Sequence, residues 1–213
     1  MFFRIVGDMM HLASLLILIF RIRQSRNCLG ISCKTQEMYL LVFLARYMDL
    51  FVYYVSLYNT FMKLAFIGLT GYLIFMMRFS RFYKSTYDWK GDNFPYWKYL
   101  LPPCAVLGLI FNPEFTPLEV LWSFSIFLEA VAFVPQLEML RQMKEVENLT
   151  SHYVFCLGAY RVLYIFNWMS RYANSQSIPW ISLFAGVVQS VLYADFFYYY
   201  IKARLNNQKT VHI

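Results

Sequence analysis

The sequence predicts an all-α integral membrane protein with seven transmembrane helices, and three observations lead to that class. First, 60% of its 213 residues are hydrophobic and only 15% are charged, whereas soluble domains average nearer 45–50% apolar and about 25% charged. Second, apolar runs recur along the whole chain, each long enough or nearly so to cross a bilayer as a helix. Third, short loops rich in Lys and Arg separate these runs.

The seven expected spans are residues 3–20, 38–57, 61–77, 97–112, 117–139, 152–171 and 178–201. The first run lacks a small-residue cleavage site, so we expect it to remain as a span rather than to be removed as a signal peptide. Pro102 and Pro103 interrupt the fourth run, which makes it the shortest. We expect one membrane domain over residues 1–213, with a short tail at about 202–213.

The distribution of Lys and Arg predicts the orientation. Loops 21–37, 78–98 and 140–151, together with the tail, hold 14 of the 19 basic residues. Because cytoplasmic loops carry the excess of Lys and Arg, the N-terminus is expected outside or in the lumen and the C-terminus in the cytosol. The same pattern explains the net charge of +7 without a nucleic-acid partner. The sequon at Asn148 then falls in the cytosol and is expected to stay unmodified.

The sixth run has a polar face. Its members are spaced i, i+4, i+7, i+8 and i+11 along a helix: Tyr160, Tyr164, Asn167, Trp168 and Arg171. Arg161 lies at the edge of this face, and an arginine at mid-membrane costs roughly 2.5–3.5 kcal/mol. It therefore needs an acid or a water-filled cavity, and Glu129 is a candidate partner, even if only as a structural ion pair. We expect this helix to line a polar pocket.

Other ionisable residues within or at the ends of the spans are Arg4, Asp8, His11, Arg46, Asp49, Glu119, Glu138 and Asp195. A luminal cavity lined by arginines suits an anionic ligand with several carboxylates, because guanidinium groups bind carboxylates bidentately. Glu119 at the mouth could accept a cationic group of the same ligand. The reference pKa of histidine, about 6.5, makes His11 a candidate pH switch. A hydrogen-bonded structural histidine, and helix-end carboxylates that reach water for Asp8 and Asp49, are the alternatives.

Metal and enzyme chemistry find no support in the sequence. The four cysteines lack metal-ligand spacing, so we expect free or buried thiols and no cofactor. No nucleophile–base pair or HExxH motif is visible, so no enzyme is expected. Pro135-Gln136 is a PQ dipeptide near the end of the fifth run. Two three-helix units joined by a linking fourth helix would form a parallel-repeat transporter. A proton-coupled transporter of a small solute is therefore the alternative function, with His11, Asp49, Glu129 and Asp195 as its relay.

Several stretches from end to end carry a resemblance to a known family. They are 3–12 (FRIVGDMMHL), 30–32 (GIS), 46–51 (RYMDLF), 56–60 (SLYNT), 116–129 (TPLEVLWSFSIFLE), 135–137 (PQL), 150–153 (TSHY), 157–168 (LGAYRVLYIFNW), 171–172 (RY) and 185–197 (AGVVQSVLYADFF). With these stretches the sequence resembles the KDEL receptor family, the sorting receptors that retrieve soluble endoplasmic-reticulum proteins. The resemblance implies a seven-helix fold similar to SWEET and PQ-loop transporters.

The resemblance also implies a ligand, the C-terminal tetrapeptide Lys-Asp-Glu-Leu or His-Asp-Glu-Leu of cargo, bound in the acidic Golgi and released at neutral pH. Arg46 with Tyr47 would hold its terminal carboxylate. Arg4 and Arg171 would take its acidic side chains, with Trp168 packing beside them. The full expected ligand-binding set is Arg4, Arg46, Tyr47, Glu119, Tyr164, Asn167, Trp168 and Arg171.

Two further pairs follow from the resemblance. His11 with Tyr160 would sense pH, and Glu129 with Arg161 would form the neighbouring lock. Glu119 would face the basic or histidine residue at the first ligand position.

On the cytosolic side, Asp195 would belong to the recycling apparatus, and the basic residues of the tail would contact the COPI coat: Lys202, Arg204 and Lys209. The expected membranes are those of the endoplasmic reticulum, the Golgi and transport vesicles, with membrane lipid as a further partner. Two features depart from the family pattern: residues 173–180 (ANSQSIPW) lack an acid near Pro179, and the tail lacks an adjacent lysine pair.

Overall fold

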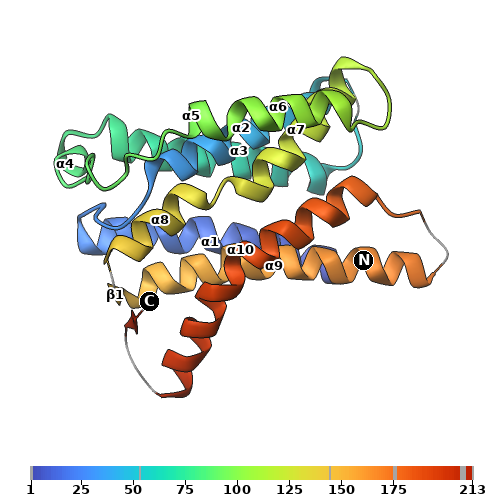
Figure 1. Cartoon of the computed structure of the whole chain (residues 1–213). Helices are drawn as coiled ribbons and strands as arrows, with labels where there is room; N and C mark the ends of the chain where they lie inside the picture. The colour runs from blue at the N-terminus through green and yellow to red at the C-terminus, as the bar shows by residue number, and fades with distance from the viewer. Residues whose placement is uncertain (1, 53, 144, 175–176, 207–209, 213) are drawn as a thin grey trace. The chain divides into compact units, whose positions relative to one another are not determined.

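Helices form nearly all of the regular structure, as predicted. The computed structural model describes residues 2–52, 54–143, 145–174, 177–206 and 210–212. In chain order the elements are α1 (Phe2–Ser25), α2 (Cys33–Arg46), the 3-10 helix η1 (Tyr47–Phe51), α3 (Leu57–Arg78), α4 (Arg81–Lys84), α5 (Tyr96–Tyr99), α6 (Leu101–Ile110), α7 (Pro117–Val131), α8 (Val134–Met143), β1 (Glu145–Val146), α9 (Asn148–Ala173), α10 (Trp180–Leu205) and β2 (Val211–His212). Figure 1 shows these elements along the chain.

The chain divides into two compact units. Unit 1 comprises residues Met1–Ile31 and Leu137–Ile213, and unit 2 comprises residues Ser32–Gln136. In unit 1, α9 packs against both α1 and α10, and in unit 2, α7 packs against α2 and α6 while α2 also packs against α3. Unit 1 thus contains both α1, from the start of the chain, and α9 and α10, from its end, so the two units are not the two halves of the sequence.

Among the described residues, four helical segments are long and apolar enough to cross a membrane: Phe2–Ser25, Leu57–Arg78, Pro117–Met143 (α7 together with α8) and Trp180–Ala203. Each of the other three expected spans also contains helix, but α2 has 14 residues, α6 has 10, and α9 carries the polar face. The all-α membrane class is thus supported. Three parts of the expectation stay predictions: the number of seven spans, the two three-helix repeats, and a single domain that includes the whole chain.

The expected fifth span is broken by its PQ dipeptide. Pro135 has no N–H and its ring clashes with the preceding turn, and α7 ends at Val131 before α8 begins at Val134. The backbone N–H of Gln136 donates to the Thr35 hydroxyl at 3.0 Å, and its side-chain oxygen accepts from the Ser32 N–H at 2.9 Å. The dipeptide therefore joins α8 to the start of α2.

A small β-pair lies outside the all-helical expectation. β1 and β2 pair antiparallel, with Glu145 opposite His212 and Val146 opposite Val211. Both valines are fully buried. The buried valines Val146 and Val211 thus hold β2 against the residues that precede α9. A two-residue pairing between segments so far apart in sequence leaves no periodicity to recognise.

All four cysteines carry free thiols that are buried: Cys28, Cys33, Cys104 and Cys156. Cys33 begins α2, where Ser32 caps the helix by accepting from the Thr35 N–H. Burial, together with the neighbouring Glu37 carboxylate, raises the pKa of the Cys33 thiol to about 12. Since the thiolate is the reactive form of cysteine, this thiol is unreactive at neutral pH.

Close packing of α6 on α7 depends on Gly108. A β-carbon at this position would lie 2.8 Å from both the backbone nitrogen and the Cα of Phe124. Gly108→Ala should therefore push the two helices apart and lower the free energy of unfolding by about 1–3 kcal/mol, measured as a lower apparent Tm of the purified protein in detergent. Gly68→Ala in α3 is the matched control, since nothing lies within 4 Å of its added β-carbon. Equal melting of the two variants would contradict this account.

Candidate ligand-binding site

The helix pair α1 and α9 forms the core of unit 1. The two helices run antiparallel, because Gly7 near the start of α1 lies against Tyr164 near the end of α9, whereas Arg21 near the end of α1 contacts Glu147 just before α9 begins. A β-carbon on Gly7 would lie 3.1 Å from the Tyr164 ring. The small residue thus lets the aromatic face of α9 approach the backbone of α1.

Tyr160 is the centre of a polar cluster in unit 1. Its ring stacks on the His11 imidazole, with centroids 4.1 Å apart and an interplanar angle of 9°. Its hydroxyl accepts from the Gln189 amide at 3.2 Å and from the Arg161 guanidinium at 3.3 Å. All four side chains are buried. The structure therefore brings the proposed pH-sensing pair together, and Gln189 from α10 is a partner that the sequence did not indicate.

One turn further along α9, Tyr164 donates a hydrogen bond to the Asp8 carboxylate of α1. Its ring contacts Trp168 at a centroid distance of 5.8 Å, and Asn167 and Trp168 are both buried. Asp8 does not reach water as a helix-end group would, because it is also buried. The hydrogen bond to Asp8 therefore orients Tyr164, whose ring contacts Trp168.

Arg4 and Arg171 lie at one end of the helix pair. Arg4 is in the first turn of α1 and Arg171 in the last turn of α9, and both side chains are exposed. Because the helices are antiparallel, these turns are at the same end, and the ring contact of Phe3 with Phe166 at 5.9 Å joins them there. Two exposed guanidinium groups at one end of a helix pair provide donors for carboxylates.

Arg46 and Glu129 form an ion pair within unit 2. Nη2 of Arg46 lies 2.5 Å from Oε2 of Glu129, whose side chain is 2% exposed. The guanidinium Nε also donates to the Ser125 hydroxyl at 3.1 Å, and Ser125 in turn donates to the Trp122 carbonyl at 2.6 Å. Glu129 therefore neutralises the arginine that was expected to hold the terminal carboxylate of a ligand.

After Arg46 the chain continues as the 3-10 helix η1. Tyr47, its first residue, stacks on Phe43 at 5.6 Å. The Lys63 ammonium lies 5.5 Å from the Tyr47 ring centroid and pairs with Asp49 at 2.7 Å. Lys63 is buried, so Asp49 compensates a cation from α3.

Glu119 takes part in the start of α7, and its predicted role toward a ligand stays a prediction. It lies at the start of α7, and its backbone N–H donates to the Thr116 hydroxyl that caps the helix. The spacing Thr-Pro-Leu-Glu is that of a capping box, and an acid in the first turn is favoured by the helix dipole.

The remaining predicted residues are spread over the two units. Glu129 belongs to unit 2 and Arg161 to unit 1, so their pairing stays a prediction. Asp195 is exposed on α10. Of the tail residues, Lys202 is exposed and Arg204 lies within α10, whereas Lys209 lies outside the described residues.

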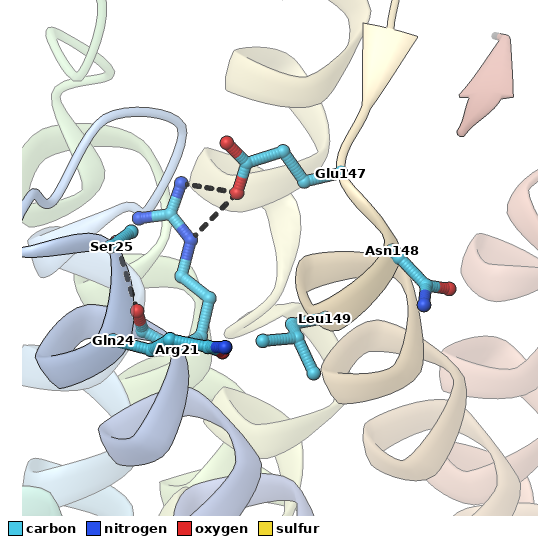
Figure 2. Close-up of a pocket in the computed structure, with 6 residues that line it drawn as sticks. All are labelled: Arg21, Gln24, Ser25, Glu147, Asn148 and Leu149. Atoms are coloured by element: carbon cyan, nitrogen blue, oxygen red, sulfur yellow. Dashed lines mark hydrogen bonds and ion pairs between the residues drawn. The ribbon is translucent and has the colours of Figure 1, made fainter. Parts of the chain in front are cut away.

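A cavity of about 290 Å³ opens at the far end of the α1–α9 pair from Arg4. Figure 2 shows its lining residues, which are Arg21, Gln24, Ser25, Glu147, Asn148 and Leu149. The buried Arg21 guanidinium donates to Glu147 at 2.9 Å and to the Asn27 and Leu29 carbonyls. It therefore fastens the loop after α1 to the start of α9, which is a structural role.

The described helices include four segments long and apolar enough to cross a membrane, and two buried charges, Glu129 and Lys63, are paired with partners from other elements of their unit. Residues 27–171 match the family model described as ER lumen protein retaining receptor. The chain is 48% identical to the ER lumen protein-retaining receptor of Plasmodium falciparum, over 98% of this chain and 96% of the relative. Receptor B of Arabidopsis thaliana and the receptor of Drosophila melanogaster are each 48% identical, over 97% of this chain and 96% of theirs. The chain belongs to the ER lumen protein retaining receptor family.

The ion pair of unit 2 yields a stability prediction. Removing one member of a buried ion pair typically costs about 3–5 kcal/mol, and we expect Glu129→Gln to fall at the lower end because Arg46 is partly exposed. The measurement is the apparent Tm of the purified protein in detergent. Glu138→Gln makes the same chemical change at an exposed site of the neighbouring helix and should change stability by less than about 0.5 kcal/mol. If both variants melted like the wild type, the pair would not stabilise unit 2.

Proposed function

We propose that the chain is a sorting receptor for the C-terminal Lys-Asp-Glu-Leu or His-Asp-Glu-Leu signal of soluble endoplasmic-reticulum proteins. It would bind the signal in the acidic Golgi, return its cargo to the endoplasmic reticulum and release it at neutral pH. Membership of the receptor family supports this function. The single structural observation that carries the proposal is the presence of guanidinium groups able to meet the carboxylates of such a peptide.

Within unit 2, Arg46 would hold the terminal carboxylate of the ligand, with Tyr47 beside it. The Glu129 carboxylate already contacts this guanidinium, so a ligand carboxylate would take over a site that is adapted to the same chemical group. Ser125 would keep the guanidinium oriented through its hydrogen bond to Nε. Glu119, at the first turn of α7, would face the cationic side chain of the ligand.

Within unit 1, Arg4 and Arg171 would take the acidic side chains of the ligand. Trp168 would pack beside them, supported by Tyr164 and its hydrogen bond to Asp8. Asn167, buried on the same turn of α9, would supply a further polar contact. Both arginines are exposed, so a peptide could approach their side chains.

The cytosolic part of the proposal concerns transport. The N-terminus would lie in the lumen and the C-terminus in the cytosol, and the receptor would move between the membranes of the endoplasmic reticulum, the Golgi and vesicles. Lys202, Arg204 and Lys209 would contact the COPI coat, with Asp195 taking part in recycling. The excess of Lys and Arg in alternate loops supports this orientation.

The first test of this function is ligand chemistry. A free-acid peptide ending in Lys-Asp-Glu-Leu should bind the purified receptor at mildly acidic pH, and its C-terminal amide should not, because the amide removes the charge that Arg46 would pair with. Calorimetry or fluorescence polarisation measures both affinities. Arg46→Gln should lose the preference for the acid. Arg23→Gln, at an exposed position on the opposite end of α1 from Arg4, should retain it. Equal affinity of the wild type for acid and amide would rule out this ligand assignment.

The second test concerns pH. Protonated His11 would be favoured in the bound state by the anionic ligand and by the Asp8 carboxylate one turn away on α1. Its ring stacks on Tyr160, and the Arg161 guanidinium that donates to the Tyr160 hydroxyl would oppose protonation. Linkage then makes affinity highest at acidic pH and lets it fall as the pH rises, by at most about tenfold per unit for one proton. Affinity should be measured from about pH 5.5 to 7.5, a range centred on the reference pKa of histidine. His11→Ala should bind weakly and equally across it, and an unchanged slope would place the sensor elsewhere.

A further inference from the structure

The segment from residue 79 to residue 99, between α3 and α6, exposes an unusual set of side chains, and we refer to it as the aromatic–basic loop. Its exposed aromatic residues are Phe79, Phe82, Trp89, Trp97 and Tyr99. Its exposed basic residues are Arg81, Lys84, Lys90 and Lys98. In Figure 1, α4 and the residues after it lie beyond the C-terminal end of α3, and α5 leads back toward α6.

A buried carboxylate holds the middle of this loop in place. Asp92 accepts from the Ser32 hydroxyl at 2.9 Å, from the Lys34 N–H at 3.2 Å and from the Tyr87 hydroxyl. Burial, together with the adjacent Asp92, raises the pKa of Tyr87, so its hydroxyl keeps the proton that it donates. The Lys34 ammonium also donates to the Phe94 carbonyl at 3.1 Å. The loop is thereby fixed to the start of α2.

A second carboxylate fixes the two ends of the loop. Glu37 of α2 pairs with Arg78 at the end of α3 and accepts from the Tyr96 hydroxyl of α5 at 2.9 Å. The Arg78 guanidinium also lies 5.5 Å from the centroid of the Trp89 ring. The Glu37 carboxylate is thus occupied by Arg78 and Tyr96.

The outer surface of the loop is therefore positive. Asp92 is buried, and Asp88 is engaged locally by the backbone N–H groups of Lys90 and Gly91 at 3.1 and 2.9 Å. No other acid lies between residues 79 and 99. Four exposed cations thus lie beside five exposed aromatic rings on a loop that buried polar contacts fix to α2.

The position of the loop identifies the surface that it meets. It begins one residue after Arg78, where an apolar helix long enough to cross a membrane ends. Amphipathic aromatic rings are stabilised at the level of lipid headgroups, and Lys and Arg are attracted there by anionic lipids. We propose that the aromatic–basic loop is a preformed binding surface for anionic phospholipids of the leaflet that it faces. This inference is independent of the ligand that the receptor retrieves.

The experiment uses the full chain reconstituted in bilayers of phosphatidylcholine with spin-labelled lipids. Electron paramagnetic resonance gives the association constant of labelled phosphatidylserine relative to labelled phosphatidylcholine at the protein surface. For the wild type this ratio should be several-fold above one, and it should fall when salt is raised because screening weakens charge attraction. The triple variant Arg81→Gln, Lys84→Gln and Lys90→Gln should bring the ratio close to one.

The matched control removes the same charge from three exposed residues elsewhere. Arg23, Arg26 and Arg141, all exposed, are replaced by Gln, and the ratio should stay near the wild-type value. Thermal melting checks that both triple variants remain folded. The single variant Lys84→Arg keeps the charge, so it should retain the wild-type preference for phosphatidylserine. A wild-type ratio of one would overturn the proposal. An equal loss in the triple variant and its control would also overturn it, since the preference would then come from net charge and not from this loop.

Discussion

Polar side chains on apolar helices must find their partners inside the protein, because the bilayer core offers none. The ion pair of Arg46 with Glu129 is the strongest example of this constraint, since a buried carboxylate and a guanidinium come from different helices of one unit. The Tyr160 cluster and the hydrogen bond from Tyr164 to Asp8 satisfy the same requirement in the other unit. In unit 2, the Arg46 guanidinium that compensates Glu129 is also the group proposed to hold the terminal carboxylate of a ligand.

Membrane character and most helix positions could be predicted from the sequence, because apolar runs and basic loops are local signals. The polar face of α9 could be predicted for the same reason, since helical spacing alone places Tyr160 and Tyr164 on one side. The pair of His11 with Tyr160 was expected from the family resemblance alone, because spacing within one helix does not show which side chains of other helices lie opposite it. The sequence predicted a pair of Glu129 with Arg161, which stays a prediction, and it did not indicate the ion pair of Glu129 with Arg46 within unit 2. A helix-end carboxylate that reaches water was one of two alternatives for Asp8, and its burial and its contact with Tyr164 argue against that alternative.

The PQ dipeptide has both an architectural interpretation, from the sequence, and a local one, from the structure. From the sequence it indicated a transporter-like repeat, which concerns the whole architecture. In the structure its effect is local: Pro135 interrupts a long apolar helix, and the amide groups of Gln136 bind Ser32 and Thr35 at the start of α2. The break interrupts the helix, but the Gln136 N–H and its side-chain oxygen both have hydrogen-bond partners. A motif can thus be explained by hydrogen bonding before any functional meaning is assigned to it.

The burial of all four thiols has a practical consequence for labelling chemistry. A maleimide or a spin-label reagent reacts with exposed thiolates, and the native cysteines offer it none that is readily accessible, least of all Cys33 with its pKa of about 12. A single cysteine introduced at an exposed position would therefore be the main site of modification in an otherwise unaltered chain. Membrane-impermeant reagents could then map which side of the bilayer each loop occupies without first removing the native cysteines.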